Sequence, residues 1–299
     1  MTAAVKVAAA PISWGVCEVP GWGTVLDADV VLGEMASLGL RATELGPPGY
    51  LPEDPARLRA LLAAHGLELV GGFLAIVLHD ADRVRSSLDE ADRAAALLAA
   101  GGAEVLVLAA ATGLHGYDER PELGRAEWTT LFRTCADVAA IAERHGLRTV
   151  LHPHVGTHVE REAEVTRFLD GSPLPLCLDT GHLVIGGTDP VDLARRHPGR
   201  VGHVHLKDVR ADVADRVRSG DLGYADAVRE GLYPPLGDGD VDVERLVGSV
   251  RDAGYEGWFV LEQDTALGPD DAGDVPSRDT ARSLAHLHQI VGRPPAVGG

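Results

Sequence analysis

Polar side chains that can bind a metal or move a proton follow several short apolar runs of this chain. They are Glu44, His152, His154, Asp179, His182, His205, Lys207 and Glu262. A charged group inside an apolar core is costly unless it is paired or bound to a metal. If the apolar runs are neighbouring strands, these side chains come from separate parts of the chain to one place. The spacing therefore predicts a shared site that holds a divalent cation.

Two imidazoles and two carboxylates from this set would sum to a charge of −2, which matches one divalent cation. A mixed set of nitrogen and oxygen ligands suits Mn²⁺, Co²⁺, Fe²⁺ or Zn²⁺ better than Mg²⁺ alone. No HExxH segment is present, so the indication comes from the distribution over the ends of the runs. Residues two apart on a strand share a face, so His152 and His154 should point the same way, as should His205 and Lys207.

The elements that must position these residues follow a repeated pattern, in which an amphipathic stretch is followed by glycine and then by an apolar run. Glycine ends a helix readily, and the apolar run that follows predicts a buried strand of a parallel sheet. The predicted strands are 5–13, 40–45, 67–73, 103–108, 147–152, 174–178, 201–206 and 257–262. The predicted helices are 27–37, 54–65, 83–100, 126–145, 160–170, 189–197, 242–253 and 279–291.

Eight alternating strands and helices predict an α/β fold, a single-domain (β/α)8 TIM barrel over 1–292, with its site at the carboxyl ends of the strands. The competing fold is a doubly wound open sheet, but the first strand does not lead into a GxGxxG loop. The segment 209–240 lacks a clear element and is expected to be a long loop, serving as a lid or a wall of the site. Residues 293–299 are expected to be a flexible tail.

Composition narrows the range of partners. The chain has 27 Lys and Arg against 45 Asp and Glu, a formal charge of −18. So acidic a protein is not expected to bind nucleic acid or an anionic membrane surface. Its 3 cysteines form no CxxC pair, which argues against a disulfide framework. The first residues do not resemble a signal peptide, and no apolar run is long enough to span a membrane, so a cytoplasmic protein is expected.

Four segments resemble the xylose-isomerase-like barrels that act on sugars: HPHVGT at 152–157, CLDTGH at 177–182, HVHLKD at 203–208 and LEQ at 261–263. Two others, APISWG at 10–15 and TELGPPGYLP at 43–52, are similar to the inosose dehydratase branch of that superfamily. The resemblance covers roughly residues 7–290. It implies a divalent metal, with Mn²⁺ first and Co²⁺, Fe²⁺, Zn²⁺ or Mg²⁺ as alternatives.

The resemblance also implies a ligand set. Asp179, His205 and Glu262 match ligand positions, whereas the fourth position, a Glu in isomerase-like members, is His152 here. His154 and water are therefore the alternatives to His152 as the fourth ligand, and the histidine-rich segment of the dehydratase branch favours His152. His154 and His182 match positions that contact substrate.

The predicted function is that of a lyase which dehydrates a keto-cyclitol, inosose or a close analogue, through a metal-stabilised enolate. Glu44, Lys207 and His154 are the candidate bases, and His154 or His182 could protonate the departing hydroxyl. We take Lys207 as the proton-transfer group and His154 as the acid. Trp14, Glu44, His154, His182 and Lys207 are the predicted substrate-binding residues.

Two alternatives remain open at this stage. The first is a metal-dependent ketose or cyclitol isomerase or epimerase, which would use the same metal and an enediolate. The second is a non-catalytic sugar-binding barrel that keeps Trp14 and Glu44 without needing a metal. In each case the partner is a small polyol or keto-sugar. A homo-oligomer is an expectation from the family.

Overall fold

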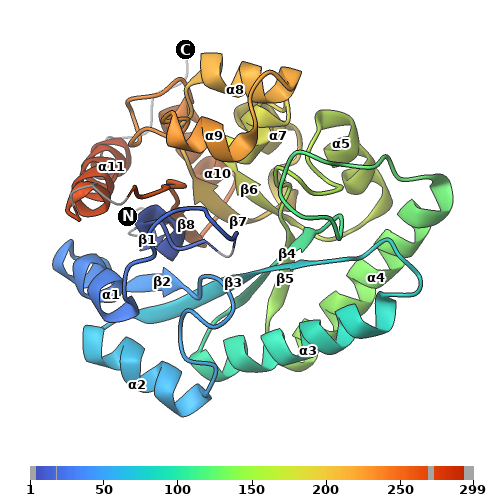
Figure 1. Cartoon of the computed structure of the whole chain (residues 1–299), viewed down its shortest axis with the longest axis horizontal. Helices are drawn as coiled ribbons and strands as arrows, with labels where there is room; N and C mark the ends of the chain where they lie inside the picture. Colours follow the sequence, from blue (N-terminus) through green and yellow to red (C-terminus); the bar gives the residue numbers. More distant parts are fainter. Residues whose placement is uncertain (1–4, 18, 269–272, 293–299) are drawn as a thin grey trace.

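A computed structural model describes residues 5–17, 19–268 and 273–292. Eight parallel strands are hydrogen-bonded in chain order, and β1 pairs with β8 to close the barrel, with Ala9 opposite Leu261 (Figure 1). The predicted single-domain (β/α)8 barrel is confirmed. The strands are β1 (Lys6–Ala9), β2 (Ala42–Glu44), β3 (Glu68–Ile76), β4 (Val105–Ala110), β5 (Arg148–Leu151), β6 (Leu176–Asp179), β7 (Val201–Leu206) and β8 (Trp258–Leu261).

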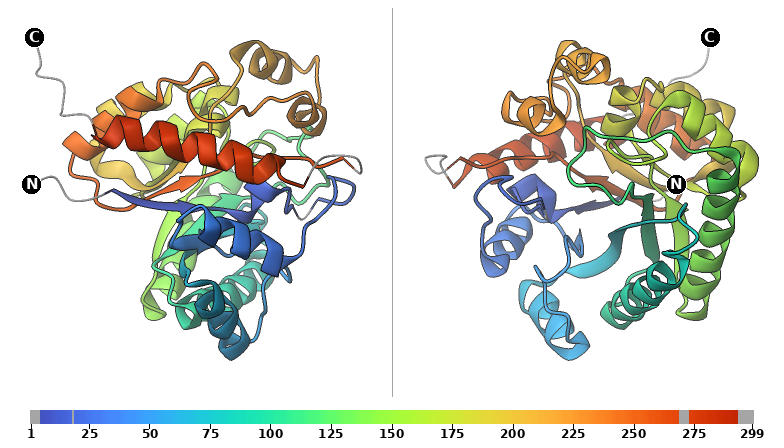
Figure 2. Two further views of the ribbon diagram at one scale, coloured as in Figure 1. Left: turned by 90° about the vertical axis from the view of Figure 1, so that its left-hand side faces the viewer. Right: turned by 45° about the vertical axis from the view of Figure 1, so that its right-hand side comes forward.

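Helices surround the strands, so that each strand is covered on its outer side (Figures 1 and 2). Eight of them correspond to the predicted set. They are α1 (Ala28–Ser37), α2 (Pro55–His65), α3 (Val84–Gly101), α4 (Arg125–Arg144), α5 (Glu162–Gly171), α7 (Pro190–Arg196), α10 (Val243–Asp252) and α11 (Val275–Gly292). Short helices add η1 (Pro11–Trp14), α6 (Thr180–Ile185), η2 (Pro198–Arg200), α8 (Ala211–Ser219) and α9 (Tyr224–Arg229).

The α2 helix illustrates how the sequence places each joint. Asp54 caps its first turn by accepting a hydrogen bond from the Arg57 amide, and Pro55 occupies the first position, where no N–H is needed. Gly66 ends the helix in the left-handed region at φ 66°. The chain then turns directly into β3, and a left-handed glycine likewise precedes β2, β4, β5 and β8.

The first strand is shorter than predicted. The sequence indicates a strand over 5–13, whereas β1 ends at Ala9 and the chain turns into η1. Pro11 has no N–H with which to continue the strand ladder, and Gly15, at φ 78°, ends the turn. This early turn decides which tryptophan reaches the site, as described below.

The sequence predicts a long loop over 209–240, whereas the structure has the helices α8 and α9 in this segment. Val213, Tyr224 and Val228 are buried, and they pack with Trp22 and Val155 from the segments that follow β1 and β5. Their burial stabilises helices that are too short to be evident from the sequence pattern. The two helices therefore cover part of the barrel's carboxyl end.

The carboxyl-terminal helix α11 begins at Val275, four residues before its predicted start, and runs to Gly292. The predicted tail, 293–299, lies outside the described residues. None of the described helices combines the length and the apolar character needed to cross a bilayer. Cys135 and Cys177 are buried free thiols.

Candidate metal centre and pocket

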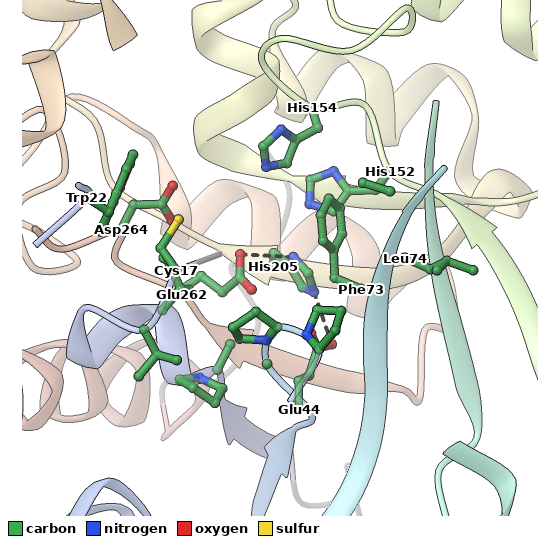
Figure 3. Close-up of a pocket in the computed structure, with 18 of the residues that line it drawn as sticks. Cys17, Trp22, Glu44, Phe73, Leu74, His152, His154, His205, Glu262 and Asp264 are labelled. Carbon is green, nitrogen blue, oxygen red and sulfur yellow. Dashed lines mark hydrogen bonds and ion pairs between the residues drawn. The ribbon is translucent and has the colours of Figure 1, made fainter. Parts of the chain in front are cut away.

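A cavity of about 290 Å³ opens at the carboxyl ends of the strands (Figure 3). Residues before β5 supply a largely apolar wall, and residues from β5 onward supply the titratable groups. The first group includes Ile12, Val16, Cys17, Trp22, Pro47, Pro48, Phe73 and Tyr117, together with Glu44. The second group is His152, His154, His205, Lys207, Glu262 and Asp264.

The four predicted metal ligands come together at the base of this pocket. One nitrogen or oxygen atom from each of His152, Asp179, His205 and Glu262 lies within 4.8 Å of the others. Asp179 Oδ2 is 3.6 Å from both His152 Nε2 and His205 Nδ1. Glu262 Oε2 is 3.1 Å from His205 Nδ1. Because strands β6, β7 and β8 are adjacent and β5 precedes them, each ligand comes from its own strand end.

Hydrogen bonds on the outer side of the imidazoles show where their lone pairs point. His152 Nδ1 is 2.7 Å from the Pro153 carbonyl oxygen, which can only accept, so Nδ1 carries the proton and Nε2 faces Asp179 as an acceptor. His205 Nε2 is 3.1 Å from Glu44 Oε1, and its Nδ1 faces Asp179 and Glu262. Although burial opposes it, Cys177, Glu262 and Glu44 raise the pKa of His205 well above its usual range, so Nδ1 holds a proton unless a metal replaces it. Acceptors that face one another in a buried place need a cation between them.

Two atoms of this set support the same conclusion. Within the part of the chain that the structure describes, the buried atoms Asp179 Oδ2 and His205 Nδ1 make no well-directed hydrogen bond; ion-pair contacts bring Lys207 Nζ to 3.4 Å from the first and Glu262 Oε2 to 3.1 Å from the second. A metal with ligand bonds of about 2.1 Å holds neighbouring ligand atoms about 3.0 to 3.4 Å apart. The observed separations, 3.1 and 3.6 Å, are close to that range. The residues present fit a divalent cation.

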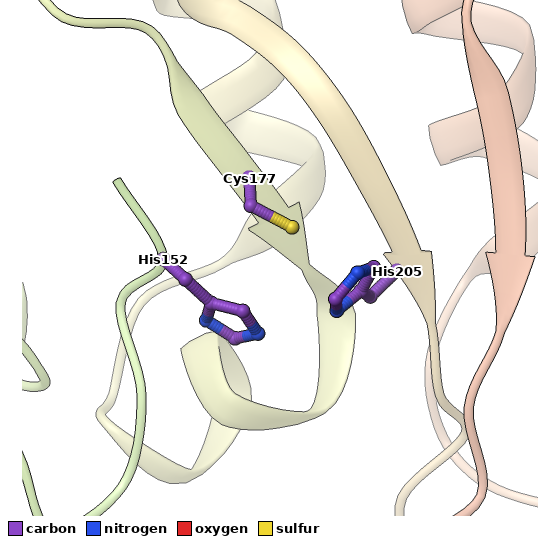
Figure 4. Close-up of side chains that lie close together, drawn as sticks. All are labelled: His152, Cys177 and His205. Atoms are coloured by element: carbon purple, nitrogen blue, oxygen red, sulfur yellow. The ribbon is translucent and has the colours of Figure 1, made fainter. Parts of the chain in front are cut away.

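Cys177 offers a competing ligand, because His152, Cys177 and His205 also lie close together (Figure 4). Burial raises the pKa of the Cys177 thiol to about 12, which disfavours the thiolate that a metal requires. Cys177 packs instead with Val105, Val107 and Val150 inside the barrel. The carboxylate set opens to the pocket, so it is the better candidate.

Glu44 lies behind His205 rather than at the centre of the pocket. Its Oε1 is 2.8 Å from His203 Nε2 and 3.1 Å from His205 Nε2. Burial alone would raise the pKa of Glu44, but the two imidazoles hold it well below its usual range. The position favours Glu44 as the group that orients His205, not as the base that the sequence suggested.

Lys207 contacts four polar partners. Its Nζ lies 2.7 Å from Asp264 Oδ1, 3.0 Å from both Glu262 Oε2 and His182 Nε2, and 3.4 Å from Asp179 Oδ2. Although burial opposes it, Asp179 and Asp264 raise the pKa of Lys207 well above its usual range. Lys207 therefore stays an ammonium and supplies positive charge at the pocket wall.

The imidazole rings of His154 and His182 pack against each other, with ring centroids 3.7 Å apart. His154 Nδ1 is 2.7 Å from the Val155 carbonyl oxygen, so Nδ1 carries the proton and Nε2 is left as an acceptor. Burial, His152 and Lys207 lower the pKa of His154 to about 3, which keeps it neutral. His154 lines the pocket, whereas His182 is 1% exposed and accepts a hydrogen bond from Lys207 behind it.

The structure corrects the prediction for Trp14. After the η1 turn its indole points into the core, fully buried, and Nε1 donates to Glu34 of α1 at 2.7 Å. Trp22 lines the pocket in its place and is held by its Nε1–H, which donates to the Thr265 carbonyl oxygen. The sequence contains both tryptophans in one loop, and only the position of the turn decides between them.

Sequence reasoning also missed Asp264, Tyr224 and Phe73. Asp264 lies in the loop after β8, two residues beyond Glu262, and that spacing was the available signal. Phe73 faces His154, with ring centroids 5.2 Å apart, and forms part of the apolar wall. Tyr224 is brought in by α9, which the sequence pattern did not reveal.

A family model described as xylose isomerase-like TIM barrel matches residues 32–289. The chain belongs to this family. Inosose dehydratase from Geobacillus kaustophilus (strain HTA426) is 35% identical over 275 residues, which cover 88% of this chain and 89% of that protein. Rhizopine catabolism protein MocC from Rhizobium meliloti is 36% identical over 266 residues, covering 86% and 81%.

Solved structures show the same fold at lower identity. L-ribulose 3-epimerase superposes with a TM-score of 0.68 at 17% identity, covering 97% of this chain and 95% of that chain. The probable 3-DHS dehydratase AsbF from Bacillus anthracis has a TM-score of 0.69 at 17% identity, covering 94% and 99%. At this identity the likeness establishes the fold alone.

Proposed function

We propose that this protein is a hydro-lyase that removes water from a keto-cyclitol, 2-keto-myo-inositol or a close analogue. The observation that carries the proposal is a four-residue ligand set at the base of a pocket, in a chain whose relatives named inosose dehydratase match it almost end to end. The cavity, about 290 Å³, has room for a six-membered ring with its hydroxyl groups.

His152, Asp179, His205 and Glu262 would hold the divalent metal, with Mn²⁺ as the first candidate. When bound, the metal supplies Lewis-acid stabilisation for the negative charge that develops on the ketone oxygen. Co²⁺, Fe²⁺, Zn²⁺ and Mg²⁺ are the alternatives to be compared, because the ligands alone do not fix the identity of the metal.

His154 is the side chain best placed to accept the proton next to the ketone. Its Nε2 is an acceptor, since Nδ1 donates to the Val155 carbonyl oxygen, and the ring lines the pocket. Lys207 adds fixed positive charge beside the developing negative charge. The His154 imidazolium would then give this proton to the departing hydroxyl, so that one water leaves in all. This assignment keeps His154 as the acid, adds the role of base to it, and leaves Lys207 as a fixed charge instead of the proton-transfer group suggested by the sequence.

The apolar wall would receive the carbon–hydrogen face of the ring. Trp22, Phe73 and Tyr117 are aromatic side chains of this wall, and such surfaces pack well against the apolar face of a sugar or cyclitol. The wall also excludes water, which strengthens electrostatic interactions at the opposite side of the pocket. A cytoplasmic location and a homo-oligomeric state stay predictions from the sequence.

The test is a substrate screen with a defined metal. The protein is treated with a chelator, reloaded separately with each candidate metal and incubated with keto-cyclitols and ketoses, and the products are analysed by mass spectrometry. The proposal expects a product lighter by one water from inosose, with a new enone-type absorbance. An isomer of unchanged mass would instead support the epimerase alternative. Binding without turnover, in a protein that retains no metal, would support a sugar-binding barrel.

A further inference from the structure

The carboxylate of Asp264 joins two side chains that come from different parts of the barrel. Its Oδ1 accepts from the Lys207 ammonium at 2.7 Å, and its Oδ2 accepts from the Tyr224 hydroxyl at 2.6 Å. The Tyr224 oxygen is in turn 2.9 Å from that of Tyr233. All four side chains are buried. Nothing in the function proposed above requires Asp264 or either tyrosine.

The stem of Lys207 is fixed, but the direction of its ammonium depends on its partners. A Cβ on Gly181 would lie 2.9 Å from Lys207 Cβ and 3.0 Å from its Cδ, so the stem passes directly over this glycine. The ring of Tyr233 lies 5.5 Å from Nζ and also contacts the position of that Cβ, at 2.8 Å. Only the last bonds of the side chain are therefore left to be set by hydrogen bonding.

Asp264 competes for the ammonium with two candidate metal ligands. Nζ is 2.7 Å from Asp264, against 3.0 Å from Glu262 and 3.4 Å from Asp179. Asp264 is not part of the ligand set, yet it makes the shortest contact. Its position draws the ammonium away from the two ligand carboxylates and keeps their oxygens available to the cation.

Tyr224 holds Asp264 in turn without lying among the pocket-lining residues. Its hydroxyl donates a hydrogen bond to the second carboxylate oxygen of Asp264, and its backbone N–H donates to Asp118 in the loop after β4. The tyrosine is thus fixed at both ends by segments that are distant in the chain. Its hydroxyl reaches the Lys207 ammonium directly through Asp264, and the route through Tyr233 ends at a ring 5.5 Å from Nζ.

We propose that Asp264 and Tyr224 are positioning residues that set the place of the Lys207 ammonium between the pocket and the metal ligands. The inference rests on the proposed function for its kinetic part, since Lys207 is there the source of positive charge. Its structural part is independent of the substrate, because it concerns only the position of Nζ.

The kinetic test compares three isosteric variants. Tyr224→Phe removes one hydrogen bond to Asp264 and should lower kcat about tenfold with little change in KM or metal content. Asp264→Asn removes the charge that holds the ammonium and should lower kcat about a hundredfold. Tyr255→Phe is the matched control, because its hydroxyl is also partly buried but donates to the Trp258 carbonyl oxygen, outside the pocket lining.

A double variant separates a shared pathway from two independent defects. If Tyr224 acts through Asp264, adding Tyr224→Phe to Asp264→Asn should leave kcat unchanged. Equal losses in Tyr224→Phe and Tyr255→Phe, or a Tyr224→Phe effect that is fully additive, would overturn the inference.

Crystal structures of Tyr224→Phe and Asp264→Asn provide the readout that does not need turnover. The inference expects Nζ of Lys207 to move toward Glu262 and Asp179 in Asp264→Asn, and to a smaller extent in Tyr224→Phe. An unmoved Nζ in both variants would refute it. If the wild-type protein leaves inosose intact, the proposed function fails, but the position of Nζ still decides the inference.

Discussion

Replacing Glu44 by glutamine tests whether a side chain behind the ligand set controls metal affinity. Glu44 Oε1 accepts from the Nε2 atoms of both His203 and His205, and His205 would bind the metal through Nδ1. Glutamine keeps the accepting oxygen but removes the negative charge. The substitution therefore weakens the support of His205 without altering the ligands themselves.

The size of the effect follows from the bond between Glu44 and His205, which is 3.1 Å long. A hydrogen bond to a charged group contributes about 1.5–3 kcal/mol and one between neutral groups about 0.5–1.5 kcal/mol, so the loss is about 1–1.5 kcal/mol. That difference corresponds to a fall of about five- to twelvefold in metal affinity, at the lower edge of what outer partners of metal ligands usually contribute.

Metal affinity is measured by competition with a fluorescent chelator, using Mn²⁺ and Zn²⁺ in turn. Glu68→Gln is the matched control, since Glu68 opens the neighbouring strand β3 and is exposed. We expect a weaker Kd for Glu44→Gln and no change for Glu68→Gln. An unchanged Kd in a folded Glu44→Gln protein would refute the assignment of Glu44 as a support of His205, and with it the orientation deduced for that ring.

Further predictions concern the metal, the two tryptophans and pH. Asp179→Asn keeps the oxygen that caps α6 but should abolish tight metal binding, so that added Mn²⁺ raises the melting temperature of the wild-type protein only. Trp14→Phe loses its bond to Glu34 and should lower the free energy of unfolding by about 1–3 kcal/mol with KM unchanged, whereas Trp22→Ala should raise KM. Burial and His79 lower the pKa of His158 to about 4, so the unfolded chain gains this proton at a higher pH than the folded one. The contribution of His158 to the free energy of unfolding is therefore fully present above pH about 6.5, and the free energy of unfolding falls by up to about 1.4 kcal/mol per pH unit as the pH drops toward about 4. Urea unfolding at several pH values should show a flatter profile in His158→Gln; an identical profile would contradict this account.

Much of the fold could be predicted because the same signals recur at five joints between a helix and the next strand. A capping aspartate, a helix of moderate length and a glycine at its end give the limits of α2, and the apolar run after Gly66 gives β3. The period of two on strands placed His205 and Lys207 on the inner face, where their contacts with Glu44 and Asp264 are found. Both signals are local, so a single sequence suffices to read them.

The parts that escaped prediction depend on contacts between distant segments. Tyr224 is ordered by packing on Trp22 and by Asp118, and no local pattern states that these three meet. The choice between Trp14 and Trp22 depends on where one short turn begins. The partner of His203 could not be named either, because the pairing with Glu44 requires the register of the closed barrel.

The pocket wall has a consequence for how the activity of such a barrel can change. Its apolar surface comes from the chain before β5, which also supplies Glu44 and Glu90, and most of its ionisable groups come from the chain after it. A chimera joined at the exposed turn of Gly146 would exchange the surface that recognises the ring and retain the cation ligands. For His205 to keep its orientation, the new amino-terminal half of such a hybrid needs an acidic residue at the place of Glu44. Ring preference and metal chemistry can therefore diverge separately in this architecture.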